Sequence, residues 1–144
     1  MPVKTLAVDP SNPAILFAGP VPVDGIGGDG VYRSTGGGLN WVQASAGLEP
    51  NALIRSIVID PSNSQIVYAA DFLSGVYVST DGGEAWRTVN DGLNQRTVNV
   101  LALANSGTVL YAGIEGAGVY RLGGAGEPSE VEDVIQIPEH SRSE

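Results

Sequence analysis

Short apolar runs separated by polar turns recur along the chain at nearly constant spacing. The segment VKTLAVDPSNPAILFAG (residues 3–19) aligns with IRSIVIDPSNSQIVYAA (54–70) and with VNVLALANSGTVLYAG (98–113). The runs LAVD, IVID and LALA are almost continuously apolar, which is typical of strands covered on both faces of a sheet. The turns Asp-Pro-Ser-Asn and Ala-Asn-Ser-Gly suit tight reversals, because Pro fixes φ while Asn and Gly accept positive φ. Each segment therefore predicts two strands joined by a tight turn.

Two more strands follow each pair. GVYRSTGGGLNW begins at residue 30, GVYVSTDGGEAW at residue 75 and GVYRL at residue 118, so consecutive copies start 45 and then 43 residues apart. The first two copies continue into a fourth strand that begins at Trp41 or Trp86. Four short antiparallel strands in a period of about 45 residues are typical of a β-propeller blade. Because no helical periodicity is present, we predict an all-β chain: a partial β-propeller of about three four-stranded antiparallel blades.

The repeats divide residues 1–122 into blades of about 1–50, 51–96 and 97–122, and an acidic tail occupies residues 123–144. The third copy lacks a fourth strand, which the β-prone run 133–137 in the tail could supply. Closed propellers usually have about four to eight blades, so three blades leave apolar faces and strand edges at both ends. Three arrangements follow: a piece of a larger propeller, association of copies, of which a homodimer completing a six-bladed ring is the simplest, or a tail that folds back over one face.

The hairpin of the second copy resembles a known motif. Its residues 79–86, STDGGEAW, resemble the Asp-box of the BNR repeat family, and the preceding GVY and the following NDGL strengthen the match. The resemblance covers residues 3–122 and is to sialidases, xyloglucanase-type glycosidases, sortilin-type receptors and photosystem assembly factors, all built on propellers. Two departures stand out: Gly36 occupies the position of the motif's Asp in the first copy, and the third copy runs into LGG at residues 122–124 without a Trp.

Each part of this hairpin has a packing role. The Asp carboxylate can accept N–H groups of its own turn, the paired glycines allow the φ values of a tight reversal, and the Trp ring can lie between adjacent sheets. The resemblance also implies a hairpin remote from the ligand-binding face. We therefore assign structural roles to Ser34, Gly38, Trp41, Ser79, Asp81, Gly83 and Trp86.

Composition and charge exclude several classes of function. The 144 residues are 42% hydrophobic and 16% charged, which is typical of a globular chain, and the absence of cysteine excludes disulfides and thiol chemistry. A formal net charge of −9 disfavours nucleic acid and anionic membranes as partners. We find neither a signal peptide nor a transmembrane segment, although a fragment of a secreted parent would be extracytoplasmic. The lone His140 and the absence of zinc, GxSxG or P-loop patterns imply no metal and no cofactor.

A ligand is expected on the side of the blades opposite the hairpins, where the second-to-third loops and the links between blades meet. These segments supply acids, a cation and an aromatic residue that suit a cationic or polyhydroxyl ligand or a Ca²⁺ ion. The simpler interpretation is that turns attract Asp, Asn and Gly. The candidate ligand-binding residues are Asp24, Asp29, Arg55, Asp71, Phe72, Arg96 and Glu115.

The sequence does not predict a catalytic residue. Lys4, Arg55 and Asn99 start the three innermost strands, so a single arginine stands where a sialidase would need three. Asp71 and Glu115 on neighbouring blades could form a carboxylate pair for glycoside hydrolysis only at a suitable separation. We predict a non-catalytic binding or scaffold module acting through protein–protein contacts, whose partner is another protein or a second copy. The alternative is a remnant or part of a secreted glycoside hydrolase, sialidase-like or xyloglucanase-like, that binds glycan.

Overall fold

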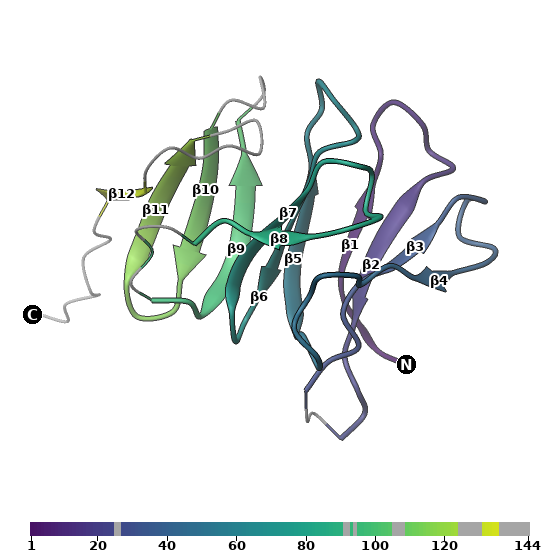
Figure 1. Cartoon of the computed structure of the whole chain (residues 1–144), viewed down its shortest axis with the longest axis horizontal. Coiled ribbons are helices and arrows are strands. Elements are labelled where there is room, and N and C mark those ends of the chain that lie inside the picture. Colours follow the sequence, from purple (N-terminus) through teal and green to yellow (C-terminus); the bar gives the residue numbers. More distant parts are fainter. Residues whose placement is uncertain (25–26, 91–92, 94, 105–108, 124–130, 136–144) are drawn as a thin grey trace, which may run out of the picture.

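Three small sheets stand side by side in the computed structural model (Figure 1). The structure describes residues 1–24, 27–90, 93, 95–104, 109–123 and 131–135. These residues form strands and turns without a helix, so nothing in these ranges could cross a membrane as an apolar helix. The predicted all-β class is confirmed.

Each sheet is a four-stranded antiparallel meander whose strands follow chain order. Blade 1 contains β1 (Val3–Val8), β2 (Leu16–Pro20), β3 (Tyr32–Ser34) and β4 (Val42–Gln43). Blade 2 contains β5 (Ile54–Ile59), β6 (Val67–Asp71), β7 (Gly75–Ser79) and β8 (Arg87–Thr88). Blade 3 contains β9 (Val98–Leu103), β10 (Val109–Ile114), β11 (Gly118–Gly123) and β12 (Val131–Ile135). The innermost strand β5 packs beside both β1 and β9, so the predicted partial propeller of three blades is confirmed.

The fourth strand of blade 3 comes from the acidic tail. β12 pairs antiparallel with β11, with Val131 opposite Leu122 and Ile135 opposite Val119. The sequence led us to expect this strand at residues 133–137, and the observed strand begins two residues earlier. Residues 136–144, which include His140, lie outside the described part of the chain.

The Asp-Pro-Ser-Asn turns are closed by their own carboxylates. Asp9 accepts hydrogen bonds from the backbone N–H of Ser11 at 2.8 Å and from its hydroxyl at 2.9 Å. Asp60 accepts the same pair from Ser62 at 2.8 and 2.7 Å. Ser64 also donates to Asp9 at 2.7 Å, which joins the turns of neighbouring blades. Burial raises the pKa of Asp9, but the hydrogen bonds from Ser64 and Ser11 outweigh it and hold the pKa below its ordinary value.

Apolar side chains fill the space between consecutive blades. One cluster, which includes Phe17 and Ile57, lies between blades 1 and 2, and the other, which includes Tyr68 and Leu101, lies between blades 2 and 3. A hydroxyl group links each pair of inner strands: Thr5 accepts from the N–H of Ile57 at 3.2 Å, and Ser56 accepts from the N–H of Leu101 at 3.0 Å. Burial of apolar area contributes about 25 cal/mol per Å², so both interfaces stabilise the fold.

The hairpin between β7 and β8 is built around Ser79 and Asp81. The Asp81 carboxylate accepts the Ser79 hydroxyl at 2.7 Å and the backbone N–H groups of Glu84 and Ala85 at 3.0 Å each. The Ser79 oxygen in turn accepts the N–H of Gly83 at 2.8 Å. The Ser79 hydroxyl is the largest influence on the pKa of Asp81, and together with the backbone N–H groups it lowers that pKa below its ordinary value.

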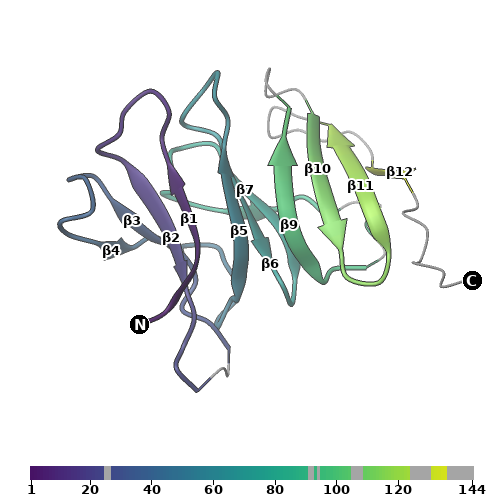
Figure 2. The same ribbon diagram turned by 180° about the vertical axis from the view of Figure 1, so that it is seen from behind.

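The hairpins lie at the same end of the blades as the Asp-Pro-Ser-Asn turns. Gly37 donates its N–H to the carbonyl of Ala14 at 2.8 Å, and Gly82 donates to the carbonyl of Gln65 at 2.9 Å. The β2–β3, β6–β7 and β10–β11 connections lie at the opposite end of the blades (Figures 1 and 2). The expected separation of the two sets of loops is therefore present in the structure.

Candidate functional site

Arg55, Phe72 and Glu115, three of the predicted candidates, are joined in one polar row across blades 2 and 3. The guanidinium of Arg55 on β5 lies 4.1 Å from the ring centroid of Phe72, a cation–π arrangement. Arg55 also donates to the side-chain oxygen of Asn99 on β9 at 3.3 Å, and Asn99 donates to Glu115 at 2.5 Å. Phe72 and Glu115 belong to the loops at the end away from the hairpins, so this row borders the expected ligand side.

A hollow of about 220 Å³ lies next to this row, with the cations Lys4 and Arg55 among its lining residues. Val21, Pro22 and Leu53 supply most of its apolar wall. Two cationic side chains beside an apolar wall can accept an anionic or polar group of a partner.

Asp71 lies in a different setting, although the sequence places it next to Phe72. Its side chain is fully buried, and one carboxylate oxygen accepts the N–H groups of Leu53 and Leu73 at 3.0 Å each. Its other oxygen accepts the hydroxyl of Ser74. These contacts close the β6–β7 turn and anchor the link that enters blade 2, so they account for this carboxylate structurally.

The remaining candidates lie on two other segments of the chain. Asp24 is exposed in the β2–β3 loop, and Arg96 is exposed in the link before β9. Asp29 is half-buried, lines a separate hollow of about 230 Å³, and accepts the side-chain amide of Gln43 through its backbone carbonyl at 2.9 Å. Among the described residues, no group of three or more acids and imidazoles is placed to hold a metal ion.

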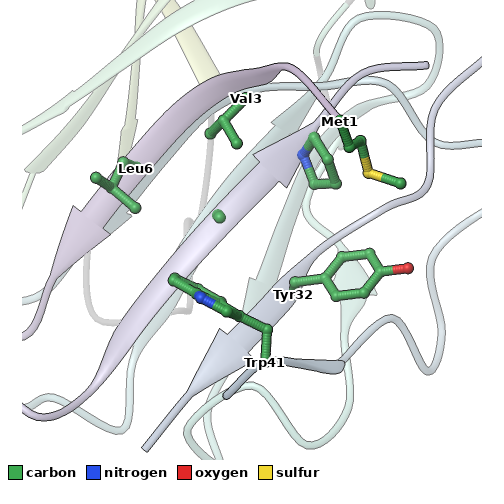
Figure 3. Close-up of a pocket in the computed structure, with 7 residues that line it drawn as sticks. Met1, Val3, Leu6, Tyr32 and Trp41 are labelled. Carbon is green, nitrogen blue, oxygen red and sulfur yellow. The ribbon is translucent and has the colours of Figure 1, made fainter. Parts of the chain in front are cut away.

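An apolar hollow lies on blade 1, on the face turned away from blade 2. It has a volume of about 360 Å³, and Figure 3 shows its side chains standing on neighbouring strands of one sheet face. We call this surface the open face; it consists of Met1, Val3, Leu6, Ala18, Pro20, Tyr32 and Trp41.

The residues of the open face have equivalents in the other blades, and those equivalents are covered. Leu6 on β1 corresponds to Ile57 on β5 and Leu101 on β9 in the repeat alignment. Leu6 is 58% exposed, whereas Ile57 and Leu101 are 5% and 4% exposed because each packs against the preceding blade. Tyr32 likewise corresponds to Tyr77, which is buried between blades 1 and 2. The open face is therefore a blade-to-blade interface without its preceding blade.

The two tryptophans show the same difference. Trp86 is 5% exposed and donates its indole N–H to the carbonyl of Ala44 in blade 1 at 2.8 Å. Trp41 is 36% exposed and donates instead to the carbonyl of Gly38 in its own hairpin at 3.0 Å. The ring of Trp86 therefore lies between blades 1 and 2, whereas no blade among the described residues covers the ring of Trp41.

Each hairpin has a glycine three residues before its tryptophan, and in blade 2 this glycine contacts the preceding blade. A Cβ atom added to Gly83 would lie 2.6 Å from the ring of Phe17 in blade 1, so Phe17 packs directly on this glycine. Gly38 is the equivalent residue, and a Cβ atom there would meet only its own Trp41, at 3.9 Å. The surface at Gly38 therefore leaves room for an aromatic side chain of another blade.

The sequence analysis anticipated exposed apolar blade faces but did not identify the residues that form them. The signal was available in the repeat alignment, because the first copy carries the apolar residues that later copies bury against a preceding blade. Val3, for example, aligns with the buried residues Ile54 and Val98.

Comparison with known proteins identifies the fold. No protein-family profile matches the chain, and no curated protein matches it. Among solved structures, it is similar to the GH74 enzyme of Niastella koreensis, with a TM-score of 0.64 and 29% identity over 83% of this chain and 20% of that enzyme. It is also similar to the GH74 xyloglucanase of Xanthomonas campestris, with a TM-score of 0.73 and 17% identity over 96% of this chain and 24% of that enzyme. A third similar structure is YCF48 bound to D1 peptide, with a TM-score of 0.63 and 14% identity over 90% of this chain and 40% of that one.

These likenesses are to propeller proteins, and they agree with the three-bladed architecture. The chain spans about a fifth to a quarter of the length of the two GH74 enzymes. It therefore has the architecture of a segment of a β-propeller.

Proposed function

We propose that the chain is a non-catalytic binding or scaffold module of the propeller type, which acts through protein–protein contacts at the open face of blade 1. One observation carries the proposal: apolar positions that are buried in blades 2 and 3 are uncovered in blade 1, at Leu6 above all. Exposed apolar patches of this kind usually mark interaction sites. The partner is a polypeptide, because the equivalent internal faces are covered by a sheet and bonded to a backbone carbonyl.

The settings of Asp71 and Glu115, the candidate carboxylate pair, favour a non-catalytic role. Hydrolysis of a glycoside requires two carboxyl groups that flank the scissile bond, one of them free to act as an acid. Asp71 is buried in its turn and accepts three hydrogen bonds there, while Glu115 accepts one from Asn99. Neither carboxylate has the setting of a general acid next to a substrate cleft.

The hairpin from Ser79 to Trp86 is, in this proposal, an Asp-box used for structure. Its Ser, Asp and Gly residues bond to one another, and its Trp joins blade 2 to blade 1. Each of these contacts is internal to the fold. The hairpin therefore belongs to the scaffold, and binding takes place elsewhere.

Glycan binding is the second candidate function, and two observations favour it. GH74 enzymes are among the similar structures, one of them described as a xyloglucanase. An aromatic ring and polar side chains also lie together in the row formed by Arg55, Phe72, Asn99 and Glu115. Stacking of a sugar on Phe72 would be the expected contact.

The two functions separate in a single set of titrations. The purified chain is titrated with the apolar dye ANS and with a xyloglucan oligosaccharide, and its mass is followed by light scattering. We expect isothermal titration calorimetry to show no binding of the oligosaccharide. We also expect the chain either to bind ANS or to associate, and Leu6→Glu to abolish whichever of the two occurs. Leu73→Glu is the matched control, because Leu73 is 62% exposed on the β6–β7 turn, away from the open face.

Saturable binding of the oligosaccharide that is lost in Phe72→Ala would replace the proposed function by glycan binding. A monomer that binds neither ANS nor another chain would also contradict the proposal. The open face would in that case be covered by a part of the same chain.

A further inference from the structure

We propose that the partner at the open face is a second copy of this chain, whose blade 3 occupies the place of a blade before blade 1. This inference rests on the proposed function, since it names the polypeptide that covers the open face. Two such contacts, related by twofold symmetry, join two chains into a ring of six blades. We call each of these contacts a seam.

The outer face of blade 3 carries the residues that such a seam requires. Side chains alternate along a strand, and Leu101, Leu110 and Ala112 point to blade 2. The intervening residues therefore point away from blade 2, and the register of the sheet places them beside one another. We define the outer face of blade 3 by these residues: Val100, Ala102, Tyr111, Val119 and Arg121.

Tyr111 is the central residue of the outer face, and its position in the repeat shows what it can contact. It aligns with Phe17 in blade 1 and Tyr68 in blade 2. Phe17 is 1% exposed because it packs on the next blade, where its ring lies against Gly83. Tyr111 is only half-buried, since no further blade follows blade 3 in the described residues.

The open face offers the matching surface at Gly38. This glycine has a φ of 91°, close to the 92° of Gly83, so the two hairpins have the same backbone shape at this point. The ring of Tyr111 from a second copy would lie on Gly38 as the ring of Phe17 lies on Gly83. Trp41 would then exchange its bond to its own hairpin for one to the incoming blade, as the bond from Trp86 to Ala44 indicates.

The seam differs from the internal interfaces in one respect. Thr5 and Ser56 supply hydroxyl groups that accept an N–H of the following inner strand, whereas the equivalent residue of blade 3 is Val100. Val100 is 54% exposed, and its side chain cannot accept a hydrogen bond. The N–H of Leu6 in the second copy thus lacks a hydroxyl partner, and the seam is weaker than the contacts within a chain. A reversible dimer follows from this difference.

A charge-complementation experiment tests the seam with the full chain. Leu6→Lys alters the open face and Tyr111→Glu alters the outer face of blade 3, both at positions that are exposed or half-buried in one chain. We expect the unaltered chain to reach twice its monomer mass in sedimentation equilibrium, and each variant to remain monomeric. An equimolar mixture regains the dimer, because one of its two seams is unaltered and the other places Lys opposite Glu. Leu73→Lys serves as the control and leaves the dimer intact.

Loss of the dimer in these variants could also result from misfolding, so a variant that strengthens the dimer is a useful second test. Val100→Thr restores the hydroxyl group, and one added hydrogen bond per seam should tighten dimerisation by about threefold to tenfold per seam. A dimer that survives Tyr111→Glu would overturn the inference, since the open faces would then meet each other. A mixture that stays monomeric would overturn it as well.

The unaltered chain distinguishes failure of this inference from failure of the proposed function. If it is monomeric at every concentration but binds ANS in a manner that depends on Leu6, the second copy is wrong as the partner and the binding role stands. If it is monomeric and binds no ANS, both are wrong.

Discussion

Replacing Gly36 by Asp should stabilise the chain, because it completes in blade 1 the hairpin that blade 2 already has. Gly36 is aligned with Asp81, whose carboxylate accepts two backbone N–H groups at 3.0 Å and the Ser79 hydroxyl at 2.7 Å. In the first hairpin the equivalent donors are the N–H groups of residues 39 and 40 and the hydroxyl of Ser34. A Cβ atom at Gly36 would meet no atom within 4 Å, and its φ lies outside the left-handed region, so Asp fits without strain.

The size of the gain can be worked out from these contacts. Each backbone hydrogen bond to an exposed carboxylate is taken at about 0.5 kcal/mol, the low end of the usual range, because water competes for it. Removing a glycine from a compatible position adds about 0.4–1 kcal/mol by restricting the unfolded chain. Gly36→Asp should therefore raise the free energy of unfolding by about 1–2 kcal/mol.

Urea denaturation monitored by circular dichroism measures this effect. For a slope of about 2 kcal/mol per M, in the middle of the usual range for urea, the midpoint should move upward by about 0.5–1 M at an unchanged slope. Asp81→Gly is the reverse variant, and it should lose about the same free energy. The reasoning is refuted if Gly36→Asp leaves the midpoint unchanged while Asp81→Gly lowers it. The carboxylate would then stabilise the hairpin of blade 2 without stabilising the equivalent hairpin of blade 1.

Three further predictions follow from burial and from pKa. Ile57→Ala should lower the free energy of unfolding by about 2–5 kcal/mol, whereas Leu6→Ala should cost less than about 1 kcal/mol below the concentration at which chains associate, both by urea denaturation; equal losses would contradict the assigned burial. Asn90→Ala should cost about 1–3 kcal/mol in the same assay, because buried Asn90 accepts the N–H of Val76 at 2.8 Å; a change within about 0.3 kcal/mol would show that water replaces this bond. Since its folded pKa is lowered, Asp81 contributes stability above about pH 4 that is lost as the pH falls through that pKa, so Asp81→Asn should show a smaller loss of stability than the unaltered chain between pH 5 and pH 2; parallel pH profiles would contradict the role of this carboxylate.

Much of the architecture was readable from the sequence, because a repeat reports the same local structure several times. The three aligned copies predicted the meander, and the apolar runs predicted sheets covered on both faces. The hairpin residues predicted the turn around Ser79 and Asp81, whose side-chain hydrogen bonds join residues no more than four apart in the sequence.

Features that depend on distant neighbours were not readable in this way. Trp41 and Trp86 occupy the same place in the motif, yet the exposure of each ring is set by whether a preceding blade is present. Asp71 looks like a loop acid, but the N–H of Leu53 in the preceding link fixes it in a buried turn. The last strand was expected two residues too late, because the register of β12 on β11 is decided by pairing between strands and not by local β propensity.

The polar row and the open face were each predicted in part from the sequence and completed by the structure. Arg55, Phe72 and Glu115 were expected on one side of the blades. In the structure Arg55 lies over the ring of Phe72 and is joined to Glu115 through Asn99, which sequence spacing alone could not show. The open face was implied by a count of three blades. The residues that form the open face were identified by comparing the exposure of equivalent positions in the three blades, such as Leu6, Ile57 and Leu101.

The most direct test of the central claim is a ¹⁹F NMR measurement on the chain labelled with 5-fluorotryptophan, recorded over a range of chain concentrations. The solvent-isotope shift of each resonance reports how far water reaches its indole ring. If the open face is a blade-to-blade interface that a second copy completes, the Trp41 resonance loses its isotope shift as concentration rises, while the resonance of Trp86 stays that of a buried ring. If Trp41 remains exposed at concentrations in the millimolar range, the open face is not such an interface for this chain, and the account is contradicted.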